Sequence, residues 1–155
     1  MSLEVIIGNH QELTDIPESW LTALEDIAPR AAELALADAA IEDSPLHHLA
    51  TLEVALVDDE TSDRVHRDFM DIEGATDVIT FHHGEIVIGA GVAARQAAEY
   101  GEPLAREILR YLVHGLLHLA GHEDADPADR SAMETAQESI IANLWTPGLQ
   151  ARLGC

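Results

Sequence analysis

Apolar residues recur along the chain with two different spacings, which predict strands in some segments and helices in others. Short runs rich in Val, Ile and Leu predict strands at residues 3–8, 52–57, 77–81 and 85–88. Apolar residues three and four positions apart predict helices that begin near residues 17, 58, 89, 104 and 126. The helix at 104–120 is the most apolar of these, and Gly121 follows it where helices commonly end.

The order of these elements predicts an α+β fold. Strands and helices alternate, but their connections are too irregular for a doubly wound parallel sheet, and residues 39–49 are expected to form a polar loop. We therefore predict a small mixed β-sheet packed with helices around the central helix at 104–120. The sequence shows no repeat and no low-complexity linker, so a single domain over residues 1–155 is expected.

The composition limits the class of protein further. Hydrophobic residues make up 47% of the chain, enough to fill a core, and disorder is therefore not expected. The apolar runs are short and interrupted by charge or His, which excludes a membrane span, and residues 1–10 lack the pattern of a signal peptide. Cys155 is the only cysteine, which excludes a Cys-rich zinc site. A cytoplasmic location is expected.

The charge of the chain is strongly negative. Its formal net charge is −21, all eight basic residues are Arg, and Lys is absent. Such a surface repels nucleic acid at long range, because phosphate contacts normally depend on clustered Lys and Arg. A general preference for acidic surfaces explains the charge equally well, since net charge concerns solubility rather than fold.

The candidate chemistry lies at the end of the 104–120 helix. His114 and His118 are four positions apart, so they share one helix face and can bind one metal ion together. Gly121 allows the chain to turn back and to bring Asp124 to the same ion. The spacing matches the zincin layout H-x-x-x-H-x-x-G-x-x-H with Asp in the third place. The alternative is that both histidines are core residues, although burial among leucines would then require other polar partners.

The third ligand is open to a second interpretation. His122 continues the four-residue spacing and imidazole is the more usual zinc ligand, but a helix that ends at Gly121 would turn His122 away and favour Asp124. Three protein ligands leave a fourth position for water, as in catalytic zinc sites. A zinc protease of this layout has Glu directly after the first His, where this chain has Gly115, and peptide hydrolysis is therefore disfavoured.

These residues resemble the signature of the YbeY family, which reads approximately H-G-x-L-H-L-x-G-[YH]-D-H. Here residues 114–124 read HGLLHLAGHED. A second family element, T-[ND]-V-[LI]-[ST]-F followed by G-[DE]-I, corresponds to TDVITF at 76–81 and GEI at 84–86. Residues 94–97 and 132–134 also resemble the family, so that the likeness extends over roughly residues 50–140.

The resemblance implies a zincin-like α+β fold with one zinc ion per chain at an open site. It further implies single-strand-specific cleavage of RNA in ribosomal RNA maturation and association with the small ribosomal subunit. The chain departs from the family at two positions. The usual third His is Asp124, and an Arg that many members carry before the second element corresponds to Met70, with Arg67 one helical turn earlier.

Several further side chains are candidates for catalysis or for RNA binding. Besides a water molecule on the metal, the candidate catalytic groups are Arg67 and Glu85, each with the alternative of a surface or structural role. Arg106 and Arg110 precede His114 at four-residue spacing and could guide phosphate, but ion pairs with neighbours such as Glu107 are favoured. In the predicted turn after residue 81, His82 could contact substrate or could simply be solvated.

We therefore expect a zinc-dependent, single-strand-specific endoribonuclease that acts in ribosomal RNA processing and small-subunit maturation. His114, His118 and Asp124 would hold the ion, which would polarise a phosphoryl oxygen and lower the pKa of a bound water. The expected partners are ribosomal RNA and small-subunit ribosomal proteins, with neither DNA nor a membrane. The alternatives are a non-catalytic ribosome-assembly factor with a structural metal, and a hydrolase of another small substrate.

Overall fold

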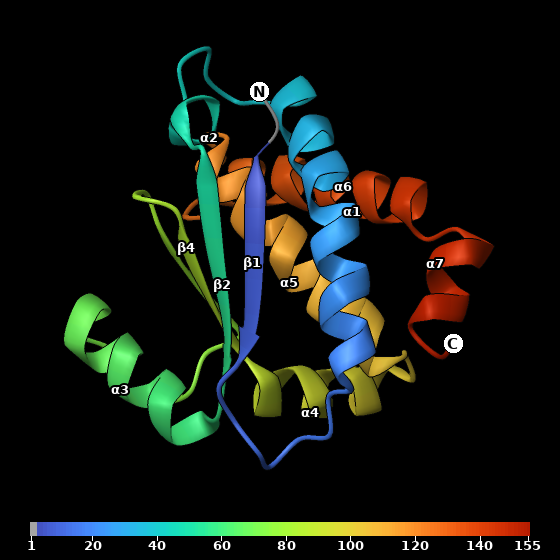
Figure 1. Cartoon of the computed structure of the whole chain (residues 1–155). Coiled ribbons are helices and arrows are strands. Elements are labelled where there is room, and N and C mark those ends of the chain that lie inside the picture. The colour runs from blue at the N-terminus through green and yellow to red at the C-terminus, as the bar shows by residue number, and fades with distance from the viewer. Residues whose placement is uncertain (1–2) are drawn as a thin grey trace.

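A four-stranded mixed sheet forms the centre of the computed structural model, which describes residues 3–155 (Figure 1). Its strands are β1 (Glu4–Asn9), β2 (Thr51–Val57), β3 (Val78–Phe81) and β4 (Glu85–Gly89), in the order β1-β2-β4-β3. The first three strands in this spatial order are parallel, whereas β3 pairs antiparallel with β4 and forms one edge of the sheet. The mixed sheet and the α+β class are as the sequence predicts.

Helices connect the strands and cover them. The longer helices are α1 (Glu18–Ala37), α3 (Asp59–Met70), α4 (Ala90–Tyr100), α5 (Leu104–Leu119) and α6 (Pro127–Leu144). Two short helices, α2 (Pro45–His48) and α7 (Pro147–Arg152), complete the described chain. None of the helices in residues 3–155 is long and apolar enough to cross a membrane.

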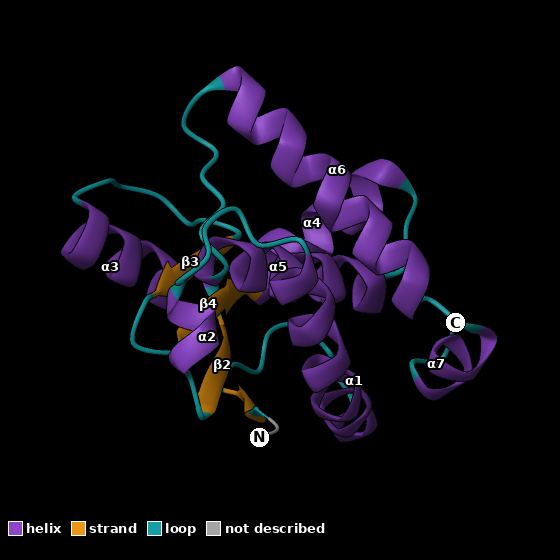
Figure 2. Ribbon diagram, turned by 90° about the horizontal axis from the view of Figure 1, so that it is seen from above, coloured by secondary structure: helices purple, strands orange, loops and turns teal. Residues whose placement is uncertain are grey.

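The two faces of the sheet are covered unequally, because side chains alternate along each strand. On β2, Leu52, Val54 and Leu56 face the main core, where α1 and α5 pack. The opposite face carries a smaller apolar cluster that includes Val57 and Val87 and lies under α3. Figure 2 shows α3 on one side of the sheet, with α1, α5 and α6 on the other. The core therefore lies between the sheet and α5.

Helix α5 packs closely against β4 because Gly115 has no side chain. A Cβ atom at this position would lie 2.6 Å from Cδ1 of Ile86, which is closer than real Cβ atoms approach. Most of the other α5 residues are buried, so the helix is enclosed along most of its length. The same contact explains why no general-base Glu follows the first histidine: the position faces a strand.

Two elements differ from the prediction. Residues 39–49 are not entirely a loop, because Ser44 begins the short helix α2 with a capping box that includes His47. Helix α6 is not the last one, because Thr146 caps α7 through the amide of Leu149. Neither helix is long enough to show an apolar period, so only the Ser-Pro and Thr-Pro pairs at their starts indicate them.

Candidate metal centre

One face of α5 brings the imidazoles of His114 and His118 together. Their Nε2 atoms lie 3.1 Å apart, and the ring centroids are separated by 4.7 Å. Both side chains are half-buried. The pair therefore has the separation that allows both nitrogens to contact one small ion, as the four-residue spacing predicts.

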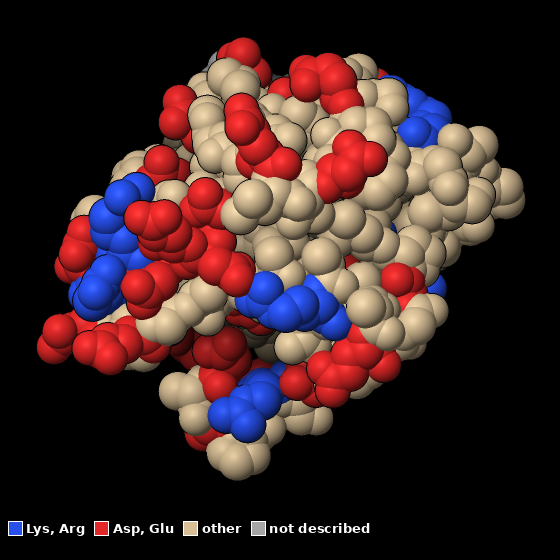
Figure 3. Space-filling model, turned by 90° about the horizontal axis from the view of Figure 1, so that it is seen from below, with Lys and Arg blue, Asp and Glu red and all other residues tan. Residues whose placement is uncertain are grey.

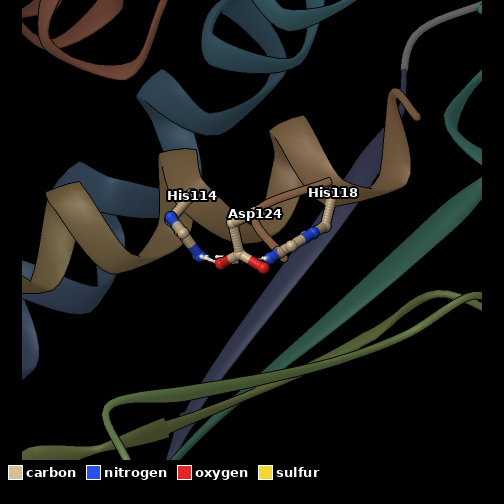
Figure 4. A group of neighbouring side chains, drawn as sticks. All are labelled: His114, His118 and Asp124. Carbon is tan, nitrogen blue, oxygen red and sulfur yellow. Dashed lines mark hydrogen bonds and ion pairs between the residues drawn. The ribbon is translucent and has the colours of Figure 1, made fainter. Parts of the chain in front are cut away.

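Asp124 completes the group from the segment that follows the helix. Gly121 has a φ of +96°, which reverses the chain after the C-cap residue Ala120. The carboxylate Oδ2 of Asp124 then lies 3.5 Å from Nε2 of each histidine. Figure 4 shows this carboxylate between the two imidazoles. One ligand atom from each of the three residues falls within 4.8 Å of the others, so the group could hold a metal ion.

The connection between α1 and α2 holds this turn in place. The amide of Ala40 donates a hydrogen bond to the Ala120 carbonyl at 3.1 Å, and Ile41 packs against Gly121. His122 forms a 2.7 Å hydrogen bond from Nε2 to the carbonyl of Asp38. The imidazole of His122 is thus bound to the α1 end, and it is not part of the three-residue group.

Hydrogen bonds at the far nitrogens set the tautomer of both candidate ligands. His114 Nδ1 lies 2.9 Å from Oε1 of Gln137, and His118 Nδ1 lies 3.0 Å from the backbone carbonyl of His122. Gln137 donates from its own Nε2 to Glu138, which keeps its amide oxygen directed at His114. Because both partners are acceptors, both Nδ1 atoms carry the proton, and both Nε2 lone pairs face the centre.

The donor set fits a divalent metal ion. Two imidazole lone pairs and a carboxylate face one another with no hydrogen atom between them, and a cation is what satisfies such a group. Burial lowers the pKa of His118, nearby His114 lowers it further, and Asp124 opposes the change. The neutral imidazole that a metal requires is therefore favoured. Two His and one Asp are ligands that zinc commonly accepts.

Two hollows meet at this group. One has a volume of about 630 Å³ and lies between α4, α5 and α6, and the other, of about 480 Å³, lies along β3 and the end of α3. His114, Asp124 and Asp77 line both of them. A polymeric substrate could therefore occupy both sides of the candidate metal centre at once.

Most of the other candidate side chains are engaged elsewhere. Arg110 forms ion pairs with Glu102, Glu107 and Glu138 at the wall of the larger hollow. The guanidinium of Arg106 lies 5.5 Å from the ring centroid of Trp145 and lines neither hollow. Arg110 therefore forms ion pairs, the role that the sequence favours for it over phosphate binding. Arg106 packs on Trp145 instead of facing either hollow.

The remaining candidates lie near β3. Arg67 pairs with Asp63 at 3.2 Å, one turn earlier on α3, and Glu85 lies 3.7 Å from His83 in the β3–β4 hairpin. Neither is among the residues that line the two hollows. His82 does line the hollow along β3, so among the candidate substrate-binding residues it is the one beside the centre on that side.

Sequence reasoning missed Gln137, the residue that orients His114. It lies 23 positions from His114, and only the packing of α6 on α5 brings the two together. Substitution of Gln137 by Met is expected to weaken zinc binding about 10–100-fold, because the imidazole loses the partner that fixes its tautomer. Competition with a chromophoric chelator would measure the change.

The matched control for this prediction is Glu134→Gln, on the same helix and in the same hollow but without a hydrogen bond to either histidine. This variant is expected to bind zinc like the unmodified chain. Equal zinc affinity in Gln137→Met and the control would show that His114 needs no such partner.

Comparisons with known proteins all lead to endoribonuclease YbeY or to a protein of the same fold. The family model for endoribonuclease YbeY matches residues 7–145. An endoribonuclease YbeY from Symbiobacterium thermophilum is 32% identical over 92% of this chain and 97% of its own length, and one from Thiobacillus denitrificans is 35% identical over 66% and 76%. A solution structure of a Thermotoga maritima protein has a TM-score of 0.60 at 23% identity and covers 91% of this chain and 89% of its own, which shows the same fold.

Proposed function

The chain belongs to the YbeY family of endoribonucleases, and on this basis we propose that it is a zinc-dependent, single-strand-specific endoribonuclease of ribosomal RNA processing and small-subunit maturation. The observation that carries the metal dependence is the group of His114, His118 and Asp124, with both Nε2 lone pairs directed at one point. We further propose one zinc ion per chain, a cytoplasmic location, and ribosomal RNA and small-subunit ribosomal proteins as partners.

Each residue of the group has a defined task in this proposal. Zinc, when bound, supplies polarisation of a phosphoryl oxygen and a more acidic water molecule. His114 and His118 hold neutral nitrogens at the centre, and Asp124 contributes the negative charge that offsets part of the cation's charge. Two histidines and one carboxylate leave room for a further ligand, which is the arrangement of catalytic rather than structural zinc sites. The hollows on both sides provide space for the RNA strand.

The surface charge restricts how RNA can bind. Figure 3 shows acidic side chains spread over one face of the molecule, with arginines interspersed among them. Arg67, Arg95 and Arg152 are each paired with an aspartate, whereas Arg130 lines the larger hollow and donates a hydrogen bond to the backbone carbonyl of Asp124 without forming an ion pair within the described residues. RNA binding therefore depends on the centre itself, on Arg130 in the larger hollow, and on contacts that do not require cationic side chains.

Cleavage of single-stranded RNA by a His114→Ala variant tests the proposal. We expect the zinc-loaded chain to cleave a single strand faster than a duplex. His114→Ala should cleave the single strand at least about 100-fold more slowly, because the variant loses both metal binding and polarisation of the phosphoryl oxygen. Time courses on gels would measure the rates, and circular dichroism would establish that the fold is intact.

His122→Ala is the matched control, because it removes an imidazole of the same segment that lies outside the group. Undiminished cleavage by His114→Ala would contradict the proposal and indicate a contaminating nuclease. Binding of RNA without turnover by the zinc-loaded chain would instead favour an assembly factor with a structural metal.

A further inference from the structure

The two phenylalanines of the chain lie together at the surface. Phe69 and Phe81 pack edge to face with ring centroids 5.2 Å apart, and His83 stacks on Phe81 at 5.6 Å with an interplanar angle of 27°. We call these three side chains the aromatic row. It joins the last turn of α3 to the β3–β4 hairpin, and Figure 2 shows these elements side by side.

The aromatic row is exposed at Phe69, whereas Phe81 is half-buried against the cluster that includes Val57 and Val87. Phe69 is 67% exposed, and Met70 and Ile72, the next apolar side chains along the chain, are 54% and 51% exposed. Most other large apolar side chains of the described chain are buried. Exposed apolar side chains grouped in this way are typical of a contact surface.

The chain neighbours of the aromatic row line the hollow along β3. Met70 and His82 line that hollow together with His114, His118 and Asp124. Met70 follows Phe69 in the chain, and His82 lies between Phe81 and His83. A strand that leaves the candidate metal centre through this hollow therefore passes the chain neighbours of the aromatic row, at the end of α3 and in the β3–β4 hairpin.

The local charges favour bases over phosphates as the bound groups. Arg67, the arginine on the same turn of α3, is paired with Asp63, and the chain as a whole has a net charge of −21. Aromatic rings attract bases without requiring positive charge, since every base has a π-face that can stack. Paired bases in a duplex are already stacked on one another and do not offer these faces.

We propose that the aromatic row is a stacking platform for the unpaired bases of single-stranded RNA. This inference rests on the endoribonuclease function proposed above and deepens it, because it assigns the preference for single strands to Phe69, Phe81 and His83. Stacking on the row positions the strand so that its backbone passes along β3 to the centre.

Binding of labelled single strands to the zinc-loaded chain tests the proposal. Fluorescence anisotropy would compare an RNA of about 12 nucleotides with an abasic strand of the same length and charge. We expect Phe69→Ala to bind the RNA roughly 10-fold more weakly and to bind the abasic strand unchanged, because only bases stack. Phe69→Trp should restore binding of the RNA.

Leu13→Ala is the matched control, since Leu13 is an 86% exposed apolar side chain outside the aromatic row and both hollows that meet at the centre. If Phe69→Ala bound the RNA and the abasic strand more weakly by the same factor, the proposal would be overturned. Unchanged binding of the RNA would overturn it as well. A dimer that Phe69→Ala converts to a monomer in light scattering would also overturn it, by assigning the row to a second copy of the chain. If the unmodified chain neither binds nor cleaves RNA, the proposed function itself fails, which distinguishes that failure from a failure of the row.

Discussion

An Asp124→Ala variant is expected to lose its zinc. The two imidazoles remain on α5, but without the carboxylate that lies 3.5 Å from both Nε2 atoms the ion has two protein ligands instead of three. We expect zinc to fall from about one ion per chain to a trace after dialysis, and affinity to fall by more than the roughly 100-fold that loss of an orienting partner produces. Elemental mass spectrometry and chelator competition would measure both quantities.

Two further variants of the same segment make this prediction specific. His122→Ala should keep its zinc, because that imidazole is outside the three-residue group and the hydrogen bond from Ala40 to Ala120 still holds the turn. Asp124→His should keep zinc as well, because an imidazole at this position supplies a third nitrogen. Retention of zinc by Asp124→Ala together with loss in His122→Ala would show that His122 is the third ligand.

An Arg110→Ala variant is expected to lose about 3–5 kcal/mol of the free energy of unfolding. Arg110 is 17% exposed and Glu107 5% exposed, so removal of the guanidinium leaves a buried carboxylate without its partner. Burial works against the charge of Arg110, but hydrogen bonds to Glu138, Glu102 and Glu107 outweigh it and raise the pKa of Arg110. Urea denaturation would measure the loss, and the melting temperature should fall by roughly 10 °C or more.

The double variant Arg110→Ala/Glu107→Gln distinguishes the stability lost through the unpaired charge of Glu107 from the stability lost through the missing Arg110 side chain. Because the buried carboxylate is then neutral, much of the lost stability should return. Arg95→Ala serves as the control at a surface ion pair, with Arg95 61% and Asp59 46% exposed, and should change stability by less than about 1 kcal/mol. Equal losses in Arg110→Ala and Arg95→Ala would show that the buried network adds nothing beyond a surface pair.

The sequence predicts most of the elements because they rest on local patterns. The apolar period of α5, the spacing of His114 and His118, and a glycine where the helix ends are all contained within residues 104–121. The position of Asp124 follows from the same local geometry. His82 was a candidate from its place in a turn, and the structure places it in the hollow along β3, which the sequence did not predict.

The residues that support the centre could not be predicted in this way. Gln137 and Asp38 meet the metal-binding segment only after α6 and α1 have packed around α5. The ion pairs of Arg110 could be predicted only in part. Glu107 is a neighbour on the same helix, whereas Glu138 belongs to another helix and meets Arg110 only in the folded chain. The aromatic row has no local signal either, since Phe69 and Phe81 belong to different elements and meet through the tertiary fold.

The contact between the α1–α2 connection and the turn at Gly121 links the candidate metal centre to the order in which the chain is synthesised. Asp38 and Ala40 leave the ribosome long before Ala120 and His122, with which they form hydrogen bonds. The two histidines of α5 can be ordered as soon as that helix forms, but the turn that carries Asp124 is held only when residues 38–41 have packed against residues 120–122. The set of three candidate ligands is therefore complete only after two segments 84 positions apart in the sequence have packed together.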